Sequence, residues 1–134
     1  MSYRNEKMSI EQVPGEPIII LDLAEDFDFG ADMDEGNQVA VQFLNSLPQP
    51  IFWVVDFRAL ERAGFTPNMD QLLFASSKVM DVWRHPKVRQ VLWVTSSSVL
   101  QLAAPGFETE VFGNLSVRTF GTLDEALAYA RSQR

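Results

Sequence analysis

Three oxygen-bearing side chains stand where apolar runs of the chain end. Asp22 and Asp56 lie at or near the ends of two such runs, and Thr95 follows a third. If the runs are parallel strands, their carboxyl ends meet at one edge of a sheet, where open α/β proteins bind their ligands. Carboxylates gathered at such an edge could hold a metal ion and support phosphoryl chemistry.

These three residues resemble the site of phosphoaccepting receiver domains. The resemblance implies a lysine after the last strand, but that strand reads Val117-Arg118-Thr119-Phe120-Gly121. The lysine is missing, so we interpret the three polar residues as caps of strand ends and loops.

An acidic loop follows Asp22. Its carboxylates are those of Glu25, Asp26, Asp28, Asp32, Asp34 and Glu35. Carboxylate oxygens bind hard cations, but the spacing does not match an EF-hand loop. Asp32 and Glu35 suit the positive end of a following helix. We therefore assign the loop to helix capping and solubility, and predict neither a metal nor a cofactor.

The residue types needed for covalent catalysis are scarce. Cysteine is absent, and His85, the single histidine, precedes Pro86. No Gly-x-Ser-x-Gly turn accompanies it, so a Ser-His-Asp triad is not indicated. The seven glycines are scattered, which excludes a glycine-rich phosphate loop. These absences predict a protein that is not an enzyme.

Apolar periodicity predicts an α/β fold. Strands are expected at 8–13, 17–23, 51–57, 88–95 and 115–120, and helices at 32–47, 66–83, 97–104 and from 122 to the C-terminus. Residues 58–64 read as a loop. The order β-β-α-β-α-β-α-β-α predicts a mainly parallel sheet of four to five strands with flanking helices. We expect a flexible tail at 1–7 and one domain at 8–134.

Composition limits the function classes. The chain has 134 residues, 46% of them apolar, and a formal charge of −7, which argues against nucleic acid as a partner. No apolar run has the length of a signal peptide or membrane span, so we expect a cytoplasmic protein that is not an integral membrane protein. Ten of the 18 acidic residues precede residue 37, and six of the 11 basic residues lie in 58–89. An acidic side and a milder basic side are possible, although solvated charge explains both runs.

Several stretches resemble STAS domains, the sulfate-transporter and anti-sigma-factor-antagonist family. Pro17-Ile-Ile-Ile-Leu-Asp-Leu looks like the strand before the family's acidic-aromatic turn, and Ile51 to Asp56 looks like its central strand. The turn at Phe120, followed by Asp-Glu-Ala-Leu, is similar to its final strand and helix. The resemblance implies a regulatory domain that binds a protein partner. A second copy of the chain, in a homodimer, is one candidate for that partner. Sec14-like carriers of lipids or other apolar ligands share the layout and are the alternative.

The resemblance places the partner surface in the segment 58–71. Its arginine, aromatic and methionine types are enriched at interfaces, and we assign to it Arg58, Arg62, Phe65, Thr66 and Met69. The serine that the family phosphorylates is missing, which leaves Thr66 as the hydroxyl at that place. The hydroxyl run Thr95 to Ser98 could instead cap a helix or bind an anion at its start. If the protein is phosphorylated, the sites are expected at Thr66, Ser96 and Ser97.

Overall fold

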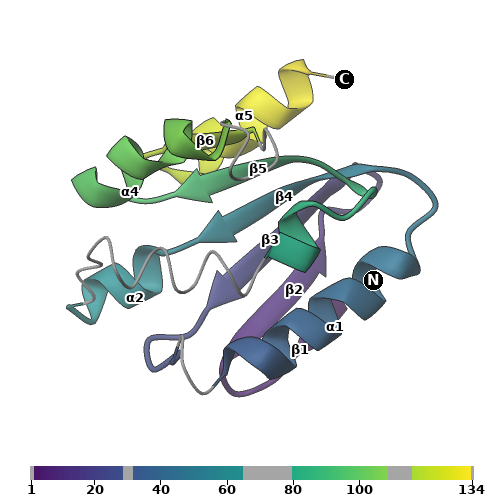
Figure 1. Cartoon of the computed structure of the whole chain (residues 1–134), viewed down its shortest axis with the longest axis horizontal. Coiled ribbons are helices and arrows are strands. Elements are labelled where there is room, and N and C mark those ends of the chain that lie inside the picture. The colour runs from purple at the N-terminus through teal and green to yellow at the C-terminus, as the bar shows by residue number, and fades with distance from the viewer. Residues whose placement is uncertain (1, 29–31, 65–79, 109–115, 134) are drawn as a thin grey trace.

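A mixed sheet of six strands forms the centre of the molecule (Figure 1). The computed structural model describes residues 2–28, 32–64, 80–108 and 116–133. The strands are β1 (Ser2–Arg4), β2 (Met8–Gln12), β3 (Ile18–Leu23), β4 (Ile51–Asp56), β5 (Val88–Val94) and β6 (Val117–Phe120). The helices are α1 (Met33–Asn45), α2 (Arg58–Arg62), α4 (Ser98–Ala103), the 3-10 helix η1 (Ala104–Glu108) and α5 (Leu123–Ser132), and residues 80–83 are also helical.

The six strands lie side by side in the order in which they occur in the chain. Strand β2 is antiparallel to both of its neighbours, β1 and β3, and β3 to β6 are parallel. Right-handed crossovers between sequential parallel strands place the connecting helices on one face of the sheet. The predicted α/β class, with flanking helices and a mostly parallel sheet, is confirmed.

The extra strand arises where the sequence predicts a flexible tail. Ser2–Arg4 pairs with β2, with Tyr3 opposite Ile10. Asn5 makes the turn, since its Oδ1 accepts the backbone N–H groups of Lys7 and Met8 at 2.7 and 2.9 Å. The prediction of four to five strands is therefore wrong, because β1 adds a sixth strand beside β2. A three-residue strand leaves almost no periodicity to detect.

Each face of the sheet carries its own apolar cluster. On what we call the α1 face, Trp53 and Val55 of β4 pack with residues of α1, α2 and α4. On what we call the α5 face, Phe52 and Val54 pack against Ala126 and Ala130 of α5. Because β4 is covered on both faces, all of its residues are buried, which explains its continuous apolar sequence. The tryptophans at positions 53, 83 and 93 are buried.

The last helix begins as the sequence predicts. Thr122 caps α5, and its Oγ1 accepts the backbone N–H of Glu125 at 3.1 Å. By contrast, the predicted loop at 58–64 is wrong, because α2 begins directly after β4. Within the described ranges, no helix is both long enough and apolar enough to cross a membrane.

Candidate functional site

The carboxyl ends of the parallel strands gather polar side chains, as the sequence suggests. Asp22 of β3 and Asp56 of β4 are register partners. Thr95 directly follows β5, and its backbone N–H donates to the carbonyl of Phe120 at the end of β6. Helix α2 lies at the same edge, since it starts two residues after Asp56. We call this region the carboxyl edge and define it by Asp22, Asp56, Arg58, Glu61, Thr95 and Ser96.

Arg58 neutralises the buried carboxylate of Asp56. Its Nη2 lies 2.7 Å from Oδ2, and its Nε lies 3.0 Å from Oδ1. The backbone N–H of Arg58 also donates to Oδ1, at 3.0 Å. The side chain of Asp56 is 7% exposed and that of Arg58 is 39% exposed. The carboxylate raises the pKa of Arg58 through its hydrogen bonds, so the guanidinium stays charged and fixes the start of α2 on the sheet.

Glu61 fastens α2 to the neighbouring loop. Its Oε2 accepts the hydroxyl of Thr95, a fully buried residue. Its Oε1 accepts the backbone N–H and the hydroxyl of Ser96, at 3.0 and 3.2 Å. Leu60, between the two anchors, is buried in the apolar cluster of the α1 face. Helix α2 is therefore held by the ion pair and backbone hydrogen bond of Arg58, by the three hydrogen bonds of Glu61 and by an apolar contact.

Asp22 is the carboxylate of this edge whose charged form is disfavoured by its surroundings. Partial burial, and then the negative charge of Asp56, raise the pKa of Asp22 above its usual range. Arg58 and Arg62 oppose this rise through their positive charges. The residue itself is exposed to solvent. Asp22 is thus a surface carboxylate beside a carboxylate that is already paired.

The arrangement of the carboxyl edge favours structure over proton transfer. The oxygens of Asp56 and Glu61 are taken up by internal donors, and the Thr95 hydroxyl is buried against Glu61. In the part of the chain that the structure describes, no three acidic or histidine side chains are grouped so that they could hold a metal ion. The edge therefore works as an anchoring network for α2.

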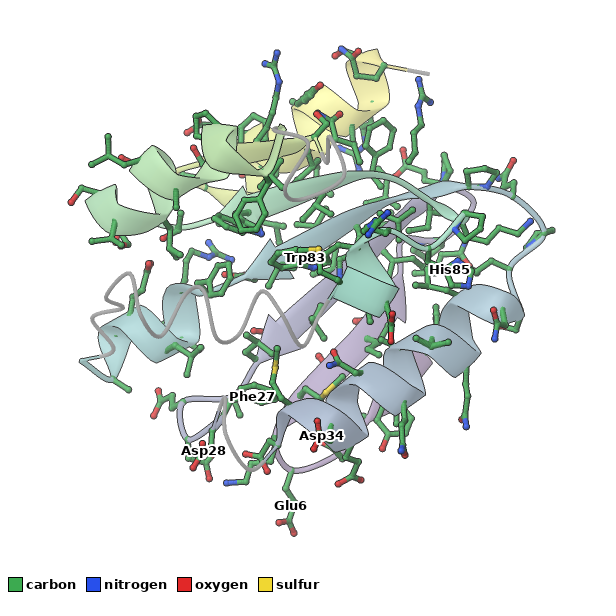
Figure 2. The ribbon with its side chains drawn as sticks, in the orientation of Figure 1. Glu6, Phe27, Asp28, Asp34, Trp83 and His85 are labelled. Atoms are coloured by element: carbon green, nitrogen blue, oxygen red, sulfur yellow. The ribbon has the colours of Figure 1, made fainter. Side chains whose placement is uncertain are left out.

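The acidic loop lies around the start of α1. Figure 2 shows Glu6, Asp28 and Asp34 at this end of the molecule. Lys7 pairs with Asp26 at 2.9 Å, and Asp32 accepts the backbone N–H of Asp28 at 2.8 Å. Asp32 is the first residue before α1, but its side chain makes no capping hydrogen bond to the helix. Its carboxylate instead closes the loop that precedes α1.

The residues predicted to form the partner surface differ in their surroundings. Arg58 is engaged with Asp56, whereas Arg62 at the end of α2 is exposed. Phe65, Thr66 and Met69 lie outside the described residues. The sequence does not indicate Glu61, because its pattern over 58–64 predicts a loop. The signal was its spacing of three residues from Arg58, which puts both side chains near one helix face.

The predicted phosphorylation sites of the hydroxyl run differ in their surroundings. Ser96 is exposed and donates to Glu61. Ser97 caps α4, since its Oγ accepts the backbone N–H of Leu100 at 3.3 Å, and its own N–H donates to Thr95. Capping, one of the two interpretations of this run, is therefore observed at Ser97.

His85 joins two segments rather than serving a hydroxyl nucleophile. Its Nδ1 accepts the backbone N–H of Lys87 at 3.0 Å, which leaves the proton on Nε2. Nε2 then donates to Oδ1 of Asn45 at 2.7 Å, at the end of α1. His85 therefore ties the segment that follows the helical residues 80–83 to the end of α1 (Figure 2).

Comparisons with family models, with curated proteins and with solved structures gave no match for this chain.

Proposed function

We propose that this protein is a non-enzymatic regulatory or protein-interaction domain of the STAS type, and that it binds its partner through α2 and the segment that follows. The observation that carries the proposal is the double anchoring of α2. Arg58 holds it to β4, and Glu61 holds it to the loop after β5. A helix fixed in this way presents Arg62 to solvent in a defined position, at little entropic cost on binding.

The chemistry of the carboxyl edge supports binding rather than turnover. A catalytic carboxylate must reach the proton that it moves. The carboxylates of Asp56 and Glu61 instead accept hydrogen bonds from their own chain. The element order that resembles STAS domains also supports the proposal, since that family is regulatory.

A Sec14-like carrier is the second candidate, and one observation favours it. The indole N–H groups of Trp53 and Trp93 are buried, and neither has an acceptor among the described residues. Buried donors are nearly always satisfied, so a polar atom of a bound ligand would suit this position. Native mass spectrometry of protein purified from its own host separates the two candidates, because a carrier should retain an adduct of lipid size.

The proposed function is tested through Arg62, which is exposed. Wild type, Arg62→Glu and the control Arg84→Glu are used as baits in extracts of the native host. Arg84 is also exposed but lies in the segment before β5. We expect a partner that wild type and Arg84→Glu capture and that Arg62→Glu loses, with the same melting temperature for all three. Equal capture by Arg62→Glu would place the interface elsewhere.

A further inference from the structure

A β-bulge at the amino end of β5 changes the direction in which the side chain of Arg89 points. Ile51 pairs with Val88, whereas Phe52 pairs with Gln90, so β5 contains one extra residue, Arg89. A bulge of this kind turns a side chain away from the regular alternation. The Nη2 of Arg89 accordingly donates to the carbonyl of Gln133 at the end of α5, at 2.6 Å. Arg89 therefore lies on the α5 face of the sheet.

Two arginines on this face are stacked on aromatic rings. The guanidinium carbon of Arg89 lies 4.9 Å from the centre of the Phe52 ring, and that of Arg118 lies 5.0 Å from the centre of the Tyr129 ring. The two rings are 6.4 Å apart. The Tyr129 hydroxyl donates to Oε1 of Gln90 at 2.9 Å, which fixes its ring. We call Arg89, Phe52, Tyr129 and Arg118 the arginine platform.

The platform carries positive charge that no carboxylate of the described chain neutralises. No ion pair joins Arg89 or Arg118 to an acidic residue within those ranges, and both residues are exposed. The nearby Arg131, by contrast, is paired with Glu16 at 2.9 Å. Acidic residues outnumber Lys and Arg by 18 to 11 in this chain, so carboxylates are available to pair with most arginines. Two guanidinium groups that have none instead form a positively charged surface that complements an anion.

We propose that the arginine platform binds a carboxylate-rich segment of a partner protein. Stacking on a ring leaves the N–H edge of a guanidinium available for hydrogen bonds, and this edge matches the two oxygens of a carboxylate. Arg89 uses its Nη2 for the carbonyl of Gln133, and its remaining N–H groups make no hydrogen bond to the described residues. Because the rings hold both arginines in place, little side-chain entropy is lost on binding. The surface lies at the amino ends of β5 and β6, opposite the carboxyl edge, so it is independent of the proposed function of α2.

An acidic peptide fits the platform better than a nucleic acid does. Single-stranded nucleic acids need ring faces on which bases stack. Here Phe52 is buried, and a guanidinium covers the ring of Tyr129. The formal charge of −7 also disfavours a polyanion that extends beyond the platform.

The test measures the binding of fluorescein-labelled hexaglutamate by fluorescence anisotropy. Arg89→Gln with Arg118→Gln should weaken binding roughly tenfold, and Arg118→Gln alone roughly threefold, as expected for exposed ion pairs. The control Arg4→Gln with Arg84→Gln changes the net charge equally at two other exposed positions and should bind as wild type does. Added salt should weaken the binding of wild type.

Three results would overturn the proposal. Wild type fails to bind the peptide, the platform variants bind as well as the Arg4 and Arg84 control, or labelled oligo-dT binds more tightly than hexaglutamate. Because Arg89 covers Phe52, its substitution can loosen the fold. Melting curves of all variants are therefore recorded, and Arg118→Gln, at an exposed position on the edge strand, gives the comparison if the double variant unfolds.

Discussion

Replacing Arg58 by alanine should destabilise the protein by leaving the carboxylate of Asp56 without its charged partner. Breaking a fully buried ion pair in this way costs about 3–5 kcal/mol. Here the side chain of Arg58 is 39% exposed, so water can enter the vacated place, and the backbone N–H of residue 58 still donates to Asp56. We therefore expect the free energy of unfolding to fall by about 2 kcal/mol.

Urea unfolding followed by tryptophan fluorescence measures this loss, because Trp93 packs against Phe57 at the start of α2, with ring centres 5.8 Å apart. Two companion variants identify its cause. Arg58→Lys keeps the charge but loses the paired geometry, so its loss should be smaller. In Asp56→Asn with Arg58→Ala, no buried charge is left unpaired, and the loss should be less than the sum of the single losses.

A loss below about 0.5 kcal/mol in Arg58→Ala, the range of an ordinary surface substitution, would refute the anchoring role of Arg58. Additive losses in the double variant would also contradict it. If Arg58 anchors α2, a variant in which both Arg58 and Arg62 are substituted could lose its partner because α2 unfolds. Such a variant would not separate an effect on folding from an effect on binding. The proposed interface is for this reason tested through Arg62 alone.

Three further changes probe the same framework. Because partial burial and the charge of Asp56 raise the pKa of Asp22, Asp22→Asn should be more stable than wild type at pH 7. The difference in stability should narrow as the pH falls through the raised pKa of the folded state, and it should close below about pH 3, where Asp22 is protonated in the folded and unfolded states. Urea midpoints at pH 7 and at about pH 3 measure this, and a less stable Asp22→Asn at pH 7 would contradict it. Glu61→Ala should cost about 1–2 kcal/mol in urea unfolding, since the buried Thr95 hydroxyl loses its acceptor, and unchanged stability would mean that Glu61 is not an anchor. Thr122→Ala should cost about 1 kcal/mol through the lost cap of α5, and a melting temperature equal to that of wild type would contradict this role.

The elements that the sequence predicts correctly are those whose signal is local. The run Ile51 to Val55 is apolar throughout because both faces of β4 are covered, and Thr122 with Glu125 marks the start of α5 within four residues. The strand Ser2–Arg4 and the helix Arg58–Arg62 are too short to show a period. Their formation depends on partners elsewhere, β2 for the strand and the carboxyl edge for the helix.

The candidate sites show the same limit more strongly. That Asp22 and Asp56 meet follows from parallel strands, and the structure places them in register. Arg58 forms an ion pair with Asp56 because of the turn between β4 and α2. No periodicity in the sequence reveals this turn. The contact of Glu61 with Thr95 joins residues 34 positions apart, and Arg89 reaches the α5 face only because β5 has a bulge. Long-range pairing and register therefore decide which charged groups remain available to a partner.

The two ends of the parallel strands use arginine in opposite ways, and this difference assigns them different tasks. At the carboxyl edge, Arg58 pairs with the buried carboxylate of Asp56, so its charge is neutralised and the pair holds α2 on the sheet. At the amino ends, Arg89 and Arg118 rest on aromatic rings, which orient a guanidinium without neutralising it. A ring contact leaves the N–H edges and the net charge available to a second molecule, whereas an ion pair does not. The arginine platform therefore suits the acidic partner that we propose for it, and the interface that we propose at α2 has its shape fixed before a partner binds.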